Sequence, residues 1–290
     1  MYQALKTVWN ELTSPGQPFE ITSVEVRGQS IKAYAAAPPS LREMWLASAA
    51  FADRDYLVYE NERWTYSDAH RDVAAIANWM AKQGIKQGDR VAIAMRNYPE
   101  WLLLYWACVS QGIAVVGVNA WWVASELAFG LEDSAPKLLI CDQERLDRFN
   151  EIKDQFPDLP VVGVRLKAPI DGVIDFSEVL KDGGELPAAS IDPDEDACIF
   201  YTSGTTGRPK GAQLTHRGCV NNVMNLAFWG TAMSHSLARA NNMPPPDPSV
   251  APIAAGLITT PLFHVTANNC MAQGTTLSGG KLVHMYRWDA

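Results

Sequence analysis

The sequence predicts an α/β fold in which mostly parallel sheets are flanked by helices. Short apolar runs such as 90–95 and 137–141 lack strict alternation, which is typical of parallel strands buried on both faces. Segments with helical periodicity separate them, as at 100–109 and 125–133. Hydrophobic residues make up 48% of the chain and charged residues 19%, the balance of a globular protein.

The N-terminal residues 1–40 are expected to form an irregular arm. After it, Ser40 and Glu43 have the spacing of a helix capping box. Ser67 is expected to cap a second helix that Gly84 ends. Further strands are expected at 56–59, 64–66, 90–95, 112–118, 137–141, 159–164, 197–201, 257–260 and 281–285, and further helices at 100–109, 125–133 and 217–232.

We expect three parts along the chain: the N-terminal arm (1–40), a first α/β subdomain (41–190) and the start of a second α/β subdomain (191–290). Residues 171–194 are rich in Asp, Gly and Pro, which is typical of a connection. Four prolines between residues 238 and 251 exclude a helix or a central strand there, so we expect a mobile surface loop.

Composition excludes several classes of protein. The net charge of −8, without any Lys or Arg run, argues against a nucleic-acid-binding surface. Five widely spaced cysteines without a CxxC pair predict neither a disulfide framework nor a zinc site, but core thiols in a reducing, cytoplasmic compartment. We find no signal peptide and no transmembrane segment, because polar residues and glycines interrupt the most apolar region, 101–124. Peripheral membrane contact through Trp121 and Trp122 stays open.

The most informative segment is 200–211, which reads F-Y-T-S-G-T-T-G-R-P-K-G. Glycines and short hydroxyl side chains let successive backbone amides converge on an anion, and Lys210 adds a mobile charge suited to phosphate. Pro209 before Lys210 and Gly211 after it distinguish the segment from a Walker A loop. Because 212–214 is expected to be a strand, the loop should join two strands as a hairpin. A turn without a ligand is the alternative at this point.

Together with T-H-R at 215–217, this string resembles the signature of the adenylate-forming superfamily, which includes acyl-CoA synthetases, adenylation domains of peptide synthetases and luciferases. Segments 88–93, 97–100 and 126–134 also resemble the first half of that family, so the resemblance extends from about residue 40 onward. It implies an incomplete N-terminal domain of an adenylate-forming enzyme, in the acyl-CoA synthetase or fatty-acid–CoA ligase branch. The residues that it implies for binding ATP phosphates are Thr202, Ser203, Gly204, Thr205, Thr206, Gly207 and Lys210.

A second segment, P-L-F-H at 261–264, resembles the part of acyl-CoA synthetases that lies beside the carboxylate substrate and the α-phosphate of ATP. The resemblance makes His264 the implied catalytic residue, which would orient the carboxylate or stabilise developing charge. From the residues alone, the alternative is that His264 is a packed or capping histidine without a catalytic role. A role as general base is not expected, because a carboxylate has no proton to lose at pH 7. Phe228, Trp229 and Phe263 are expected to line an apolar pocket for the acyl group.

The implied reaction has two stages, in which a carboxylic acid and ATP give an acyl-adenylate and pyrophosphate, and CoA then displaces AMP to give a thioester. We assign no metal ligand to this chain. In the family the Mg²⁺ ligand, the adenine contacts and the catalytic lysine of a mobile C-terminal domain follow the P-L-F-H segment, and here the sequence ends at Ala290. We therefore expect residues 1–290 to be inactive alone.

Two other functions stay open: an acyl-adenylating enzyme that loads a carrier protein, and a non-catalytic module that binds a nucleotide or pyrophosphate. A homodimer and the identity of the acid, with an apolar chain or ring, also stay open.

Overall fold

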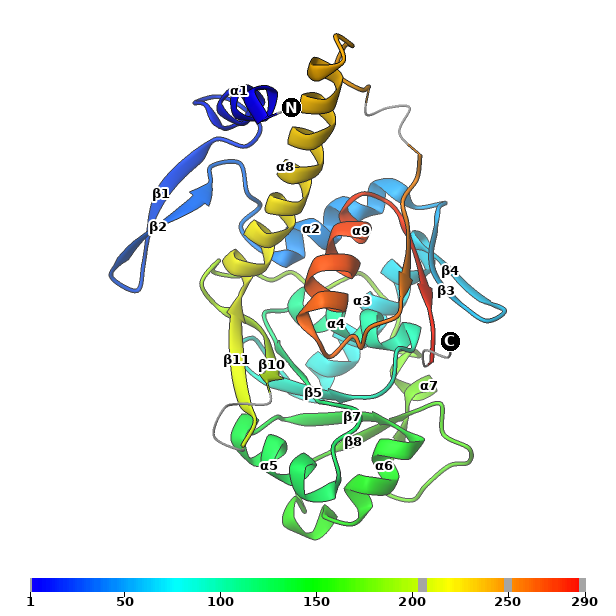
Figure 1. Cartoon of the computed structure of the whole chain (residues 1–290). Coiled ribbons are helices and arrows are strands. Elements are labelled where there is room, and N and C mark those ends of the chain that lie inside the picture. Colours follow the sequence, from blue (N-terminus) through cyan, green and yellow to red (C-terminus); the bar gives the residue numbers. More distant parts are fainter. Residues whose placement is uncertain (1, 203–207, 248–251, 287–290) are drawn as a thin grey trace.

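The computed structural model describes residues 2–202, 208–247 and 252–286. Figure 1 shows a layered α/β body, with a long helix and a small hairpin extending from one side of it. Two sheets make up this body, and their strands are mostly parallel. The predicted fold class is therefore confirmed.

The larger sheet has seven strands in the order β11-β10-β6-β5-β7-β8-β9. Neighbouring strands are parallel, except that β10 and β11 form an antiparallel pair. Its central strands are apolar and buried on both faces, as expected where helices cover a parallel sheet. The strands are β5 (Arg90–Ala94), β6 (Ala114–Gly117), β7 (Leu138–Asp142), β8 (Val161–Val164), β9 (Ile174–Asp175), β10 (Asp196–Thr202) and β11 (Lys210–Thr215).

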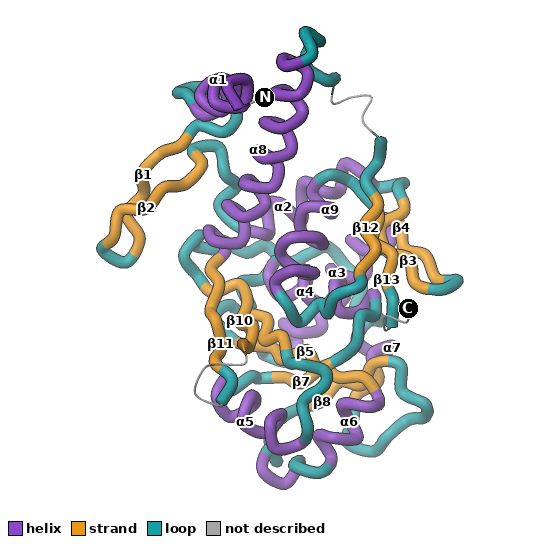
Figure 2. Tube along the Cα trace, in the orientation of Figure 1, coloured by secondary structure: helices purple, strands orange, loops and turns teal. Residues whose placement is uncertain are grey.

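Helices cover both faces of this sheet (Figure 2). Along β5, Val91 and Ile93 pack into the core that contains α3 and α4, whereas Ala92 and Ala94 pack into the core that contains α5 and α6. Every residue of α4 is buried, because this helix lies between the two sheets. The four helices are α3 (Tyr66–Lys82), α4 (Pro99–Val109), α5 (Ala124–Ser134) and α6 (Gln143–Asn150).

The smaller sheet has the order β12-β13-β3-β4 and combines early and late segments of the chain. Its strands are β3 (Asp55–Tyr59), β4 (Glu62–Thr65), β12 (Ala255–Ile258) and β13 (Lys281–His284). The expected boundary near residue 190 therefore does not coincide with a boundary between sheets. Strand periodicity predicts where strands occur, but it does not identify their partners.

The N-terminal arm is not irregular, contrary to expectation. It contains α1 (Tyr2–Thr13) and a hairpin of β1 (Ile21–Val26) and β2 (Gln29–Tyr34). A hairpin alone is marginal in water, but this arm packs on α8 (His216–Ala240) through an aromatic cluster. The ring of Phe228 lies 4.6 Å from that of Trp9 and 5.4 Å from that of Phe19, centroid to centroid. The support comes from a distant part of the chain, so local patterns did not indicate it.

Several predicted boundaries also differ from the structure. Thr65, not Ser67, caps α3, because Thr65 and Asp68 form a complete capping box. Helix α8 extends to Ala240, into the stretch 238–251 that was expected to be non-helical. The remaining short elements are α2 (Leu41–Ala47), α7 (Phe176–Val179), α9 (Gln273–Leu277), a π-helix at Thr266–Ala272 and 3₁₀ turns at Ser48–Phe51 and Lys153–Gln155.

The cysteines are unpaired, and four of the five are buried as predicted; Cys270 is exposed. Across the described ranges, no helix is both long and apolar enough to cross a membrane.

The aromatic cluster predicts a local role for Phe228. Replacing Phe228 with Ala should lower the free energy of unfolding by about 3–5 kcal/mol, the usual cost of removing a core Phe. Because the cluster joins the arm to α8, limited proteolysis should cleave the variant first within residues 2–34. The neighbouring Trp229→Ala is the matched control, since Trp229 is 52% exposed and should change little. Equal thermal unfolding of the two variants would contradict this role.

Candidate functional site

The carboxyl ends of strands from both sheets meet at a cavity of about 370 Å³. In open parallel sheets, ligands bind beyond the carboxyl ends of the strands, so this edge is where a site is expected. The segments that follow β5, β6, β12 and β13 all contribute to the wall. The lining residues are Arg96, Asn97, Trp121, Thr259, Pro261, Phe263 and Tyr286.

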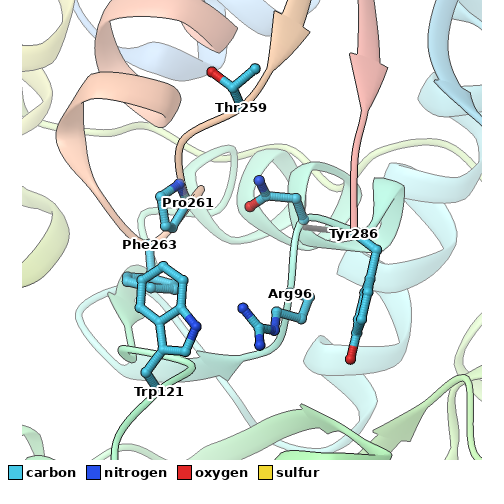
Figure 3. Close-up of a pocket in the computed structure, with 7 residues that line it drawn as sticks. Arg96, Trp121, Thr259, Pro261, Phe263 and Tyr286 are labelled. Carbon is cyan, nitrogen blue, oxygen red and sulfur yellow. The ribbon is translucent and has the colours of Figure 1, made fainter. Parts of the chain in front are cut away.

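Arg96 gives this cavity a cation between aromatic rings, as Figure 3 shows. Its guanidinium carbon lies 5.3 Å from the ring centroid of Trp121 and 5.4 Å from that of Tyr286. The ring of Phe263 meets Trp121 edge to face at 5.2 Å. Within residues 2–202, 208–247 and 252–286, no carboxylate forms a direct ion pair with Arg96, although the charge of Glu144 interacts with it at longer range. The cavity therefore presents a cation that can attract an anionic group.

His264 follows directly after the wall residue Phe263, and its side chain is exposed. A turn precedes it, in which the amide of His264 donates to the carbonyl of Pro261 at 3.0 Å. The amide of Thr266 donates to Nδ1 of His264 at 3.2 Å. Because Nδ1 is an acceptor, the neutral imidazole carries its proton on Nε2. His264 can therefore donate a hydrogen bond from Nε2 to an anionic oxygen.

The π-helix at Thr266–Ala272 begins two residues after His264, with Val265 between them. Single π turns occur frequently at functional sites. Polar contacts hold the π-helix and the start of α9, which follows it. Asn222 Nδ2 donates to the carbonyl of Asn269 at 3.1 Å, and Gln273 Nε2, at the start of α9, donates to the hydroxyl of Tyr105 at 2.7 Å. The histidine thus lies at the start of a helix with a well-packed inner face.

The predicted hairpin is present, because β10 and β11 pair antiparallel with Thr202 opposite Lys210. The Thr202 hydroxyl makes a long 3.5 Å contact to the carbonyl of Lys210, and both residues are exposed. Lys210 forms no ion pair with any described residue. The predicted loop residues Ser203, Gly204, Thr205, Thr206 and Gly207 lie outside the described residues. The described ends of the loop thus present a hydroxyl and a free ammonium group, which are groups that suit a phosphate.

Gly117, the last residue of β6, connects the hairpin with the His264 segment. A Cβ added at Gly117 would lie 2.6 Å from the ring of Phe200 and 3.3 Å from the Cα of Phe263. Phe200 belongs to β10, which leads into the loop. The absence of a side chain at Gly117 therefore lets the two predicted site segments approach the same point of β6.

A second hollow, of about 760 Å³, lies between α8 and the π-helix with α9. Its lining is mostly apolar, and Thr266, Cys270 and Met271 of the π-helix after His264 contribute to it. The lining residues are Val223, Leu226, Ala227, Ala254, Thr266, Cys270, Met271, Gly274, Thr275, Leu277 and Ser278.

The three aromatic residues expected in an apolar pocket do not converge. Phe228 packs against the N-terminal arm, Trp229 is exposed, and Phe263 lines the first cavity. Helical spacing placed Phe228 and Trp229 on α8 correctly, but it did not show that the arm covers one of them.

No metal centre is apparent in the parts of the chain that the structure describes, where no three His, Cys, Asp or Glu side chains are grouped to hold an ion.

The sequence did not indicate that Arg96, Trp121 and Tyr286 lie next to one another in the first cavity. The only available signal was their position just after predicted parallel strands.

A model of the family described as AMP-binding enzyme matches residues 45–290. The medium-chain fatty-acid–CoA ligase of Escherichia coli (strain K12) is 31% identical over 194 residues, which cover 64% of this chain and 34% of that protein. The feruloyl-CoA synthase of an Amycolatopsis species is 30% identical over 226 residues, covering 76% of this chain and 38% of that protein. The chain thus spans little more than a third of the length of these two relatives.

Solved structures show the same fold. The anthranilate CoA ligase AuaEII in complex with anthranoyl-AMP superposes with a TM-score of 0.74 at 20% identity, covering 87% of this chain and 46% of that one. The N-terminal domain of FACL13 from Mycobacterium tuberculosis superposes with a TM-score of 0.71 at 25% identity, covering 87% of this chain and 58% of that one. Since the family model matches most of the sequence, and the relatives are acyl-CoA and aryl-CoA ligases, this chain belongs to the family of AMP-binding enzymes.

Proposed function

We propose that residues 1–290 form the phosphate-loop-bearing part of an AMP-forming acyl-CoA synthetase that acts on an apolar carboxylic acid. The observation that carries the proposal is the approach of two segments to Gly117: β10, which leads into the loop, and the segment that ends at His264. The relatives support the reaction class, because they are named as CoA ligases or synthases of carboxylic acids.

The residues of the hairpin would hold the phosphates. The ammonium group of Lys210 and the hydroxyl of Thr202 are exposed at the two described ends of the loop. When bound, ATP supplies the α-phosphorus that is attacked, and pyrophosphate is the leaving group. Both reactants are anions, so Lys210 would reduce the repulsion between them and would stabilise the charge on the departing phosphates.

His264 would orient the attacking carboxylate. Its Nε2–H can donate to a carboxylate or phosphate oxygen, because Nδ1 already accepts from Thr266. No proton is removed in this step, so the imidazole acts as a hydrogen-bond donor and not as a base. The apolar hollow beside the π-helix would take the hydrocarbon part of the acid.

The charge of Lys210 can be tested by binding. Lys210→Ala should weaken binding of MgATP roughly tenfold to a hundredfold, because a hydrogen bond to a charged group contributes about 1.5–3 kcal/mol. Isothermal titration calorimetry with residues 1–290 would measure the change. Lys6→Ala removes an exposed lysine from α1, at the opposite end of the molecule from β10 and β11 (Figure 1), and should leave the affinity unchanged. Equal affinities of the two variants would sink the phosphate role of Lys210.

The apolar hollow can be tested by filling it. Ala227 is an exposed lining residue of α8, so Ala227→Trp should fold normally and occupy part of the 760 Å³. Each methylene group that can no longer be buried should cost about 0.8 kcal/mol. Binding of a fluorescent long-chain fatty acid should therefore fall at least tenfold, while Trp229→Ala, on the same helix but outside the hollow, should bind like the wild type. A wild-type affinity for Ala227→Trp would assign the acyl group to another place.

The reaction itself can be tested by pyrophosphate–ATP exchange. Residues 1–290 align with less than half of the solved AuaEII ligase, so we expect binding of MgATP without measurable exchange. An otherwise identical polypeptide that also contains the downstream coding sequence should show exchange that depends on an added apolar acid. Robust exchange by residues 1–290 alone would refute their incompleteness, and no exchange by the longer polypeptide with any apolar acid would refute the ligase proposal.

A further inference from the structure

Asn97 lies where the two sheets meet, between the end of β5 and the start of α4. It is 8% exposed, and it lines the first cavity. A buried amide side chain needs partners for both its donor and its acceptor. Those partners show what Asn97 holds in place.

The side chain of Asn97 pairs with the backbone just before His264. Its Oδ1 accepts from the amide of Leu262 at 2.9 Å, and its Nδ2 donates to the carbonyl of Thr260 at 3.0 Å. A longer contact of 3.5 Å reaches the carbonyl of Ile258 at the end of β12. One amide therefore donates and accepts along the same segment, as a neighbouring strand would.

The backbone of Asn97 is fixed as well. Its carbonyl lies 3.2 Å from Nδ1 of His284, the last residue of β13. Since a carbonyl can only accept, Nδ1 of His284 carries the proton. Burial lowers the pKa of His284 to about 3, so this imidazole is neutral near pH 7. Asn97 thus joins the end of β5 to the segment after β12 and to the end of β13.

We propose that Asn97 is the positioning residue of His264: its side-chain amide fixes the backbone of 260–262, and thereby the turn that orients the imidazole. This rests on the function proposed above for His264. Leu262 is fully buried, and the turn from Pro261 to His264 starts within the clamped segment. We call the hydrogen bonds from the Asn97 side chain to residues 260–262 the clamp. Only two peptide units separate Leu262 from His264, so the clamp leaves the backbone at His264 little freedom to move.

The chemistry requires an asparagine here. Aspartate could still accept from Leu262, but it would place a carboxylate against the carbonyl of Thr260 in place of a donor. Serine could not reach either partner, although water from the adjoining cavity could satisfy them. Both substitutions should leave a folded protein, because the residue borders a cavity that water can enter.

The test is the ¹⁵N spectrum of the histidine side chains in residues 1–290, with His264 assigned by its loss in His264→Gln. In the wild type, Nδ1 and Nε2 of His264 should give well-separated signals, because Thr266 holds one neutral tautomer. In Asn97→Asp and Asn97→Ser the turn is released, so the two signals should converge. Unchanged signals of His70 and His216, both distant in the sequence and packed in the body, would show that the fold is retained.

Asn119→Asp is the matched control. Asn119 follows β6 as Asn97 follows β5, and its Oδ1 only accepts, from the amide of Trp121 at 2.9 Å. It makes the same chemical change near the same cavity without touching the 260–262 segment, so His264 should be unaffected. The proposal is overturned if folded Asn97→Asp and Asn97→Ser keep the wild-type His264 signals, or if Asn119→Asp converges them equally.

Adding MgATP separates this proposal from the proposed function. The proposed function and the role of Asn97 are both supported if the His264 signal moves on titration in the wild type and in Asn119→Asp. In that case the signal should not move in Asn97→Asp. A wild-type signal that stays unchanged at saturation overturns the role of His264 in the reaction. The spectra without nucleotide still decide whether Asn97 orients it.

Discussion

A buried ion pair at the carboxyl edge of the larger sheet holds the loops on which the site depends. Asp142, at the end of β7, pairs with Arg145 at 3.0 Å, and their side chains are 5% and 2% exposed. Asp142 also accepts from the amide of Arg96, while Arg145 donates to the carbonyl of Ala120. The loops after β5, β6 and β7 are therefore fixed to one another. Loss of Arg145 would leave the Asp142 carboxylate buried without its cation, which typically costs 3–5 kcal/mol. Loss of Asp142 should cost less, because Arg145 also pairs with Glu144 at 2.9 Å.

A second set of contacts fixes the two sheets relative to each other. Arg165 follows β8 and forms a two-point ion pair with Glu62 of β4, at 2.8 and 2.6 Å. Its guanidinium also lies about 5 Å from the rings of Tyr59 and Tyr98. Asn97 makes the corresponding connection at the cavity. Both sets of contacts lie at the N-terminal end of α4, where Arg165 also pairs with Glu100 at 2.8 Å, so the two sheets are joined close to the cavity.

Local sequence patterns predicted the parts of this structure that are stabilised locally. The apolar runs of β5 and β7 need helices on both faces, whichever helices these are, and the strand pattern at 212–214 made the hairpin after β10 predictable. The prediction of an irregular N-terminal arm was wrong, because Phe19 of the arm packs against Phe228, which lies far along the chain. For the same reason the hydrogen bonds of the Asn97 side chain could not be predicted, because nothing near Asn97 in the sequence indicates that its side chain reaches Leu262. The predicted phosphate-loop residues 203–207 remain a prediction from resemblance.

Gly117 is a point of close approach for the two segments of the candidate site, β10 and the segment that ends at His264. The ring of Phe200 from β10 and the backbone of Phe263 both occupy space that a side chain at Gly117 would fill. Protein interiors are close-packed, so β10 and the segment at Phe263 both depend on the small size of this residue for their positions against β6. Asn97 also holds the Phe263 segment, through the amide of Leu262. The segment that ends at His264 is thus packed close to β6 and β10 at Gly117, and Asn97 ties it by hydrogen bonds to the ends of β5 and β13.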